Sequence, residues 1–380
     1  MSQEPFGDIP LFREIQKLLA SGGGPLNFEI ARQVAIAVAT QGATEVRPDE
    51  HLRRSFADAV HASEMLLSGY TRLSPPEPAR SEVTTPGNWV RATLESWRWA
   101  LEHTARRFGG ELARLGGAPG GEADPMQAAL GQIGPLLMGM QTGTLVGHLA
   151  KDALARYDLP IPREDEGKLF LVVPNVATVA GEYGLEIEGL TRWLALHEVA
   201  RHLVMTSVPW VQRYFKSLLL EVVDAIEIDV SDLERRFVEL QSMGVEALQE
   251  GVGADNVLPI VATERHRRAL DRLRSFLALF EGFAMHAANA VASEIVESRA
   301  KIDEGMARRG ASPSDGEAML SSILGISVDR ALETSGATFC AALVKLKGPA
   351  ALNHVWEAPD NLPTSEEIKD PFAWMERQDV

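Results

Sequence analysis

Apolar and polar residues recur along most of the chain with the three- and four-residue spacing of an amphipathic α-helix. The pattern is clearest in residues 28–39, 50–67 and 88–108, where an apolar stripe would face a core and charged residues would face solvent. Residues 169–176 are instead rich in β-branched side chains and include Pro174 near their end, which favours a strand. The pattern predicts a mainly α, multi-helix architecture with at most a small β element near residues 169–176.

One segment, residues 125–150, contains no Asp, Glu, Lys or Arg, and about 20 apolar residues are enough to span a bilayer. Gln, Thr, His and Pro residues dilute it, so we expect a helix buried inside protein and no membrane span. Gly139, Gly143 and Gly147 recur every four residues. This spacing places them along one helix face, where another backbone can approach closely.

Glycine and proline cluster in residues 116–125, where they prevent regular structure and therefore indicate a boundary between two parts of the chain. We predict an N-terminal helical subdomain of residues 1–115 and a helical core of residues 126–380. Near the C-terminus, Thr364 followed by Glu367 matches a capping box and predicts the start of a short helix.

Composition narrows the classes of function. The chain of 380 residues carries 53 acidic and 37 basic side chains, for a net charge of -16, and nucleic-acid binding is not expected because phosphate contacts need clustered cations. The single cysteine, Cys340, excludes an intramolecular disulfide and lies in an apolar helical pattern that favours a buried structural thiol. The first residues lack the pattern of a secretory signal, so a cytoplasmic location is expected.

The first pattern with chemistry in it reads H-E-V-A-R, with His197 first, Glu198 second and Arg201 fifth. The zinc-binding pattern H-E-x-x-H places two imidazoles four residues apart around a glutamate that activates the bound water. Here a cation stands at the second ligand position. His202 cannot simply replace it, because five residues rotate a side chain by about 140° onto another helix face. The half motif alone predicts either an ordinary helix with a satisfied histidine or an altered metal site.

A second anomaly is an isolated carboxylate. Glu281 is the only formally charged residue between Arg274 and Glu294, and its neighbours are largely apolar. A buried carboxylate in such surroundings is costly unless it is protonated, paired with a cation or bound to a metal. Either Glu281 has such a partner, or it forms a polar stripe with His286 and Asn289 that faces solvent.

Six stretches that together cover most of the chain carry a resemblance to a known family. They are NWVRATLESW, GMQTGTLVGHLAKDALARYDLPIP, LFLVVPNV, WLALHEVARHLVMTSVPWV, RALDRLRSFLALFEGFA and GPAALNHVWEAPDNLPTSEEIKDPFAWMER. With these stretches the chain resembles the zincin-like hydrolases. Members of that family are described as zinc-dependent metalloproteases and in some cases as associated with deazaflavin coenzyme biosynthesis.

The resemblance implies a gluzincin-like fold and site, in which one helix carries H-E-x-x-H and a later helix begins E-G-H. Position by position, His197 matches the first metal ligand, Glu198 the catalytic base and Glu281 the third ligand. Arg201 stands where the second histidine is expected, and Phe283 stands where the histidine after the glycine is expected. The metal-binding motif is therefore degenerate in this chain.

Two arrangements of the altered site remain open. An arginine guanidinium pairs bidentately with carboxylates, so Arg201 can neutralise Glu281 or Glu198 in place of zinc. In the other arrangement Arg201 turns away, and the first and third ligand positions hold a metal weakly together with His202 or His286.

These arrangements correspond to two functions. The first is a zincin-like hydrolase homologue with an impaired metal site, non-catalytic or metal-free, without a tightly bound cofactor and without robust peptidase activity. Its partner would be a substrate or a protein ligand. The alternative is an active zinc-dependent metallohydrolase or peptidase that uses His197, Glu198 and Glu281.

Overall fold

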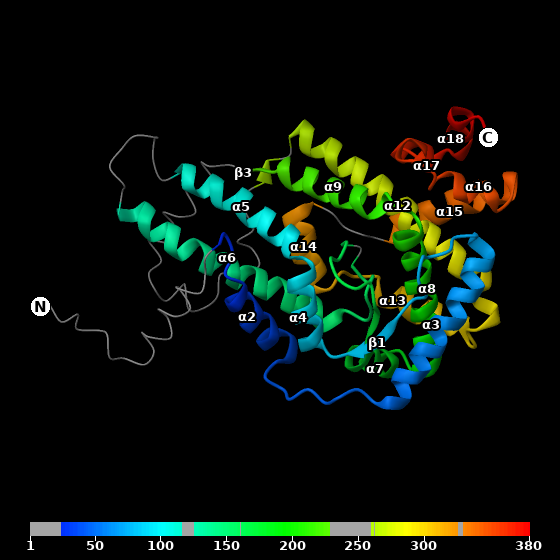
Figure 1. The fold of residues 1–380 in the computed structure, drawn as a ribbon, viewed down its shortest axis with the longest axis horizontal. Coiled ribbons are helices and arrows are strands. Elements are labelled where there is room, and N and C mark those ends of the chain that lie inside the picture. The colour runs from blue at the N-terminus through cyan, green and yellow to red at the C-terminus, as the bar shows by residue number, and fades with distance from the viewer. Residues whose placement is uncertain (1–23, 116–124, 160, 229–259, 262, 326–329) are drawn as a thin grey trace, which may run out of the picture.

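Helices dominate the described part of the chain (Figure 1), and the expected mainly α architecture is confirmed. The computed structural model describes residues 24–115, 125–159, 161–228, 260–261, 263–325 and 330–380. The α-helices are α2 (Phe28–Thr40), α3 (Glu50–Thr71), α4 (Pro86–Ser96), α5 (Arg98–Leu115), α6 (Pro125–Asp152), α7 (Val173–Glu182), α8 (Ile187–Ser207), α9 (Val211–Asp224), α12 (Glu264–Val291), α13 (Arg299–Arg309), α14 (Asp315–Leu324), α15 (Arg330–Lys347), α16 (Ala350–His354), α17 (Ser365–Lys369) and α18 (Pro371–Gln378).

Strands are short and few in the described residues. Strand β1 (Ser81–Thr84) pairs in parallel with β2 (Leu169–Val172), and β3 (Glu227–Ile228) pairs antiparallel with β4 (Ile260–Val261). The expected β element is thus confirmed in its first half. Its second half begins helix α7 instead, because Pro174 lies in the first helical turn, where a missing N–H costs nothing.

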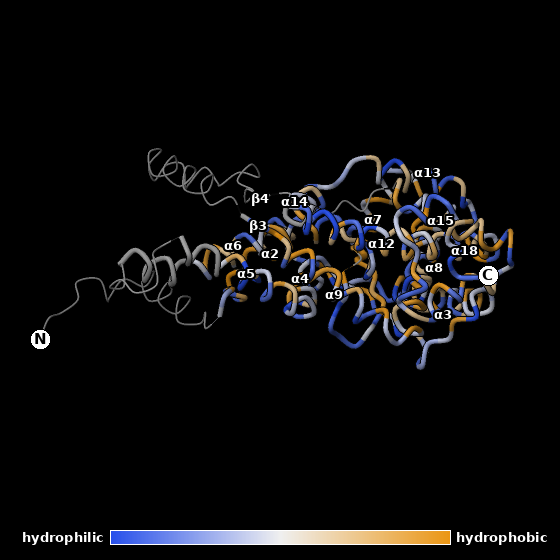
Figure 2. The backbone as a smooth tube through the Cα atoms, turned by 90° about the horizontal axis from the view of Figure 1, so that it is seen from above, coloured by the Kyte–Doolittle hydropathy of each residue, from blue (hydrophilic) through white to orange (hydrophobic). Residues whose placement is uncertain are grey.

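The larger core is built by four long helices, α3, α8, α12 and α15, that pack together at one end of the molecule (Figures 1 and 2). Helix α12 contacts both α8 and α15, and α3 lies against α8. Cys340 is fully buried in this core, and burial raises the pKa of its thiol, as expected of a structural cysteine.

A second, smaller core forms where α2 and α4 pack against α6 and strand β2. A Cβ added to Gly139 would lie 2.6 Å from the carbonyl oxygen of Asn27, and one added to Gly143 would lie 2.6 Å from that of Ala31. These distances are shorter than any real contact, so only glycine allows α6 to approach α2 this closely. The expected role of the glycine stripe in close helix packing is confirmed.

Two further glycines bring α12 and α15 into backbone contact. A Cβ on Gly282 would lie 2.2 Å from the carbonyl carbon of Gly336, and a Cβ on Gly336 would lie 1.7 Å from the carbonyl oxygen of Ala278. The face of α12 that carries Gly282 therefore has to lie against α15. At the C-terminus, the capping box of Thr364 and Glu367 is confirmed at the start of α17.

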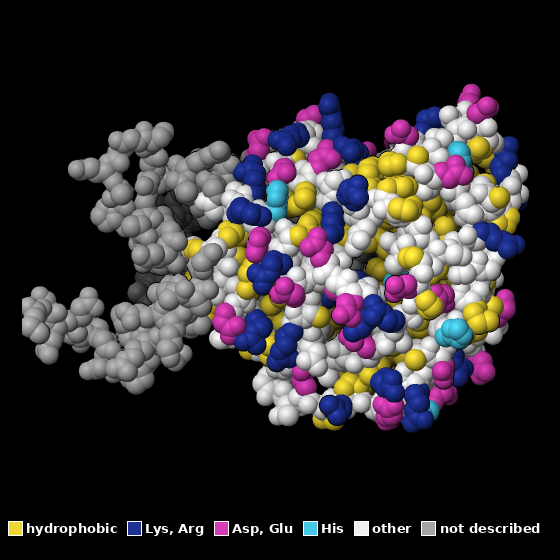
Figure 3. Space-filling model, viewed as in Figure 1, with side chains coloured by type: hydrophobic (Ala, Val, Ile, Leu, Met, Phe, Trp, Pro, Cys, Tyr) yellow, Lys and Arg dark blue, Asp and Glu magenta, His cyan; other side chains and the backbone are white. Residues whose placement is uncertain are grey.

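Some expectations concern residues or properties that the structure does not test. Residues 116–124, where we place the boundary between the two predicted parts, lie outside the described residues, so this division stays a prediction. Within the described residues, no helix has the length and apolar character needed to cross a membrane. Basic and acidic side chains are interspersed over the face in Figure 3, and the absence of nucleic-acid binding stays a prediction.

Candidate functional site

Helices α8 and α12 bring together the two anomalies found in the sequence. Nε of Arg201 donates a hydrogen bond of 2.8 Å to Oε2 of Glu281, and Nη2 of Arg201 lies 2.8 Å from the same oxygen in an ion pair. The carboxylate of Glu281 is buried, and 17% of the Arg201 side chain remains exposed. Glu281 therefore has the cationic partner that its apolar surroundings require, and the alternative of a solvent-facing polar stripe is wrong for this residue.

Glu198 lies beside this pair and is also buried. Its Oε2 accepts a hydrogen bond of 2.9 Å from the backbone N–H of Tyr157, and its Oε1 lies 3.9 Å from Nη1 of Arg201. Burial raises the pKa of Glu198 to about 8. The charge of Arg201 opposes this effect, and the carboxylate of Asp158 makes a smaller contribution that raises the pKa further. At neutral pH the protonated form of Glu198 therefore predominates.

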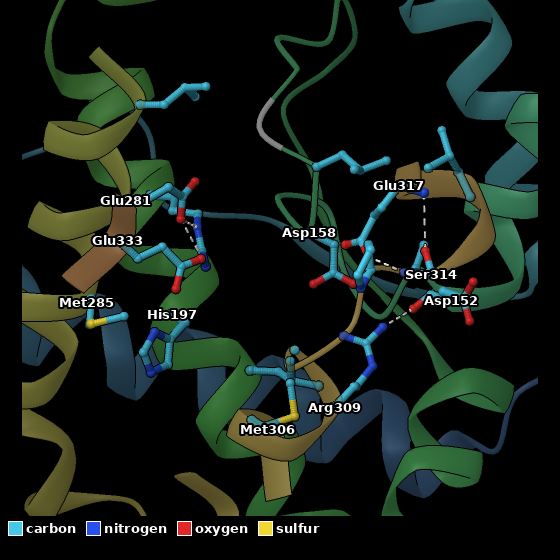
Figure 4. A pocket seen from close by; sticks show the side chains of 18 of the residues that line it. Asp152, Asp158, His197, Glu281, Met285, Met306, Arg309, Ser314, Glu317 and Glu333 are labelled. Atoms are coloured by element: carbon cyan, nitrogen blue, oxygen red, sulfur yellow. Dashed lines mark hydrogen bonds and ion pairs between the residues drawn. The ribbon is translucent and has the colours of Figure 1, made fainter. Parts of the chain in front are cut away.

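His197 precedes Glu198 on α8 and faces a cavity (Figure 4). Its ring lies against that of Trp193, with 4.0 Å between the ring centroids. Burial lowers the pKa of His197 to about 3, and the charges of Arg201 and Arg299 lower it further. The imidazole is therefore neutral, and among the described residues its ring nitrogens have no hydrogen-bond partner.

The charges of the pair are set by their surroundings. Burial alone would lower the pKa of Arg201, but the carboxylates of Glu281 and Glu198 raise it above its ordinary value. Burial raises the pKa of Glu281, and the guanidinium opposes that effect. A permanent cation held against buried carboxylates is the central electrostatic feature of this site.

The cavity has a volume of about 790 Å³ and lies between α8 and α12 on one side and the ends of α6, α13 and α14 on the other. Its far wall carries Asp152, Asp158, Arg309 and Glu317 (Figure 4). The sequence analysis did not single out these four residues. They come from three separate segments, and no local spacing indicates that they meet.

Three other candidates lie outside the cavity. His202 is buried, and its Nδ1 lies 3.2 Å from the hydroxyl of Tyr157. His286 lies 2.9 Å from the hydroxyl of Tyr70 through its Nε2. Phe283 is fully buried, where it packs edge-on against Trp356. None of the three lines the cavity, so the structure does not bring His202 or His286 to the first and third ligand positions.

The donor groups of the site can be compared with what a metal requires. A catalytic zinc ion takes three protein ligands and a water molecule. Among the described residues, no group of three His, Cys, Asp or Glu side chains lies close enough together to hold a metal ion.

Comparison with known protein families identifies the family of this chain. A family model described as zincin-like metallopeptidase matches residues 26–375. The chain is also similar to a protein from Chloroflexus aurantiacus whose crystal structure is described as that of "a putative hydrolase with a novel fold", with 25% identity, a TM-score of 0.65, and coverage of 93% of this chain and 99% of that one. No curated protein matches the chain. Since the family model covers most of the sequence, the chain belongs to the zincin-like metallopeptidases.

Proposed function

We propose that this chain is a zincin-like hydrolase homologue that works without a tightly bound zinc ion and lacks robust peptidase activity. The observation that carries this proposal is the ion pair of Arg201 and Glu281, in which two guanidinium nitrogens lie 2.8 Å from one carboxylate oxygen and one of them, Nε, donates a hydrogen bond to it. The guanidinium supplies the positive charge that a metal would otherwise supply to this carboxylate.

Counting ligands supports the proposal. Only His197 and Glu281 match ligand positions of the family pattern, and a catalytic zinc site normally needs three. One oxygen of Glu281 already accepts a hydrogen bond from Nε of Arg201 and lies 2.8 Å from Nη2. A fixed cation at that distance repels a divalent ion, so the residues present do not fit zinc.

The metal-free form of this function would use the groups that remain. His197 is a neutral imidazole whose pKa of about 3 makes it a hydrogen-bond acceptor and not a base at neutral pH. Glu198, with its pKa of about 8, carries a proton that it can donate. Glu198 is therefore suited to general acid catalysis, and if no reaction occurs both side chains still provide hydrogen bonds for binding.

One observation favours the second candidate, an active zinc-dependent hydrolase. His197 lines the cavity, and its ring has no hydrogen-bond partner among the described residues, so a ring nitrogen is available to bind a metal ion. In that case His197 and Glu281 would be ligands and Glu198 the base, and Arg201 would have to leave the position it occupies.

Metal analysis of protein purified without chelators separates the two candidates. We expect zinc far below one equivalent in the native chain. Arg201→His restores an imidazole four residues after His197 and removes the repelling charge, so zinc affinity should rise clearly. Arg192→His is the matched control, because Arg192 lies on the same helix, is half-exposed and does not line the cavity. Near-stoichiometric zinc in the native chain that is lost in His197→Ala would refute the proposal.

A further inference from the structure

The cavity separates two walls that carry charged side chains. His197 and Glu281 lie on one wall, and Asp158, Arg309 and Glu317 lie on the other (Figure 4). Its volume of about 790 Å³ falls within the range of small-molecule sites, which is roughly 300–1,000 Å³. The cavity is large enough for an organic molecule or the end of a peptide.

The charge of the lining is strongly unbalanced. The described lining includes seven carboxylate side chains and three arginines. Each arginine already has a partner: Arg201 binds Glu281, Arg299 binds Asp303, and Arg309 donates to a backbone carbonyl at the end of α6. Three of the acidic side chains, Asp152, Asp158 and Glu317, form no ion pair with an arginine or lysine among the described residues. A concave site with an excess of one charge sign attracts ligands of the opposite sign.

Burial also acts on the acidic side chains of this wall. It raises the pKa of Asp152 and of Asp158 above their ordinary values. A ligand cation that reaches these groups stabilises their ionised forms, so it can form an ion pair with them.

One buried polar group of the lining lacks a hydrogen bond, and this observation is independent of the charge count. Oε1 of Glu281 is buried without a partner, in a residue that is 3% exposed. Buried polar groups are nearly always hydrogen-bonded. An unpaired carboxylate oxygen in a residue that lines the cavity therefore indicates that a ligand supplies the missing bond. The His197 ring faces the same cavity (Figure 4) without a hydrogen-bond partner among the described residues, so it is available to a ligand as well.

The remaining lining is largely apolar. Trp193, Leu194, Leu277, Met285 and Met306 contribute to it. A ligand that fills the cavity must therefore bury an apolar chain or ring in addition to placing a charged group.

From these observations we propose that the cavity binds an organic cation, namely a primary ammonium or guanidinium group carried on an apolar chain or ring. The cation lies against the wall of Asp152, Asp158 and Glu317, and the apolar part lies along Trp193 and Met306. The proposal rests on the proposed function in one respect: Arg201, and not zinc, neutralises Glu281.

Three probes that share one apolar body test the proposal by isothermal titration calorimetry of the EDTA-treated full chain. They are phenylbutylamine, phenylbutanol and phenylbutyrate, which carry a cation, a neutral group and an anion at the same position. We expect the amine to bind about tenfold or more tightly than the alcohol, and the carboxylate to bind most weakly.

Two conservative substitutions locate the cation. Asp152→Asn and Glu317→Gln each remove one negative charge, and glutamine keeps the capping box that Glu317 forms with Ser314 at the start of α14. Each should weaken amine binding about threefold or more and leave alcohol binding unchanged. Glu294→Gln, an exposed residue outside the cavity, is the matched control and should change neither.

Equal affinity for amine and alcohol, a preference for the carboxylate, or no binding of any probe would overturn the proposal. Unchanged amine affinity in both cavity variants would overturn it as well. The zinc content of the same preparation before EDTA treatment decides the proposed function separately, so each idea can fail without hiding the failure of the other.

Discussion

Two arginine clusters are buried in this molecule, and the numbers of their acidic and basic side chains are unequal in opposite directions. At the cavity, one cation, Arg201, faces the carboxyl groups of Glu281 and Glu198. In the second cluster, two cations, Arg156 and Arg163, share the single carboxylate of Asp165. The first cluster has more carboxyl groups than arginines, and the second has more arginines than carboxyl groups.

The second cluster accommodates its excess cation through contacts within the folded core. Arg163 donates to the hydroxyl of Thr93 at 2.9 Å, and burial lowers its pKa to about 10. Aromatic rings face its guanidinium at 5.0–5.7 Å, and their negative faces attract a cation; they belong to Phe170, Trp97 and Trp89. Nη1 of Arg163 still lacks a hydrogen-bond partner, but the rings offset part of its charge.

The comparison shows that a buried arginine does not by itself indicate a functional site. The guanidinium of Arg163 is enclosed by rings, a hydroxyl and a carboxylate, which are contacts of a folded core. The carboxylates around Arg201 instead border an open cavity together with an unpaired histidine. The candidate site is distinguished by unequal numbers of acidic and basic groups beside a cavity, and not by burial.

The largest expected effect comes from removing Arg201, the cation of the first cluster. Arg201→Met should lower the free energy of unfolding by about 3–5 kcal/mol, because it leaves the buried carboxylate of Glu281 uncompensated. Glu281→Gln should cost clearly less, since Arg201 keeps Glu198 and some solvent contact. Urea unfolding followed by circular dichroism measures both. Equal and negligible effects would mean that the two side chains do not form a buried pair.

His202 tests whether burial and the nearby charge of Arg156, a member of the second cluster, keep a histidine neutral. Burial lowers the pKa of His202 to about 4, and the charge of Arg156 adds to this. The unfolded chain therefore takes up a proton near pH 6.5 that the folded chain refuses, and stability falls as the pH decreases from about 6.5 to about 4, by up to about 3 kcal/mol.

His202→Asn removes this titration and keeps an amide that can reach the hydroxyl of Tyr157. Urea unfolding between pH 7 and pH 4 should therefore show a flatter loss of stability than in the native chain. The difference between the two proteins isolates His202, because both keep Glu198. Parallel curves would show that His202 is not held neutral by its surroundings.

The smallest expected effect comes from the excess cation of the second cluster. Arg163→Met keeps a similar apolar volume, and Asp165 retains its two hydrogen bonds of 2.7 and 2.9 Å from Arg156. We expect a loss of about 1–2 kcal/mol in the free energy of unfolding. A loss as large as that of Arg201→Met would contradict the view that the rings and Arg156 compensate this cluster.

Local patterns in the sequence predict a good part of this structure. Helix periodicity predicts the mainly α fold, the glycines from Gly139 to Gly147 predict the close contact of α6 with α2, and Thr364 with Glu367 predicts the start of α17. The solitary charge of Glu281 in an apolar helix predicts its need for a partner. Each of these features depends on residues within a few turns of one another.

The sequence does not reveal the far wall of the cavity. Asp152, Asp158 and Glu317 meet only because α6 and α14 converge in the folded chain, and nothing in their local spacing indicates this. The strand β1 was also missed, since Ser81–Thr84 follows a proline-rich segment and pairs with a strand almost ninety residues later. Long-range contacts of this kind depend on the packing of whole helices.

The backbone contact between Gly282 and Gly336 also limits how this site can change. Any side chain at either position would push α12 away from α15, and Glu281, the residue before Gly282, would move with it. The helix that carries Glu281 therefore cannot slide or turn to suit a new ligand. Variation in such a site has to come from exchanges at the tips of side chains, such as the arginine at position 201, while the position of the carboxylate stays constant.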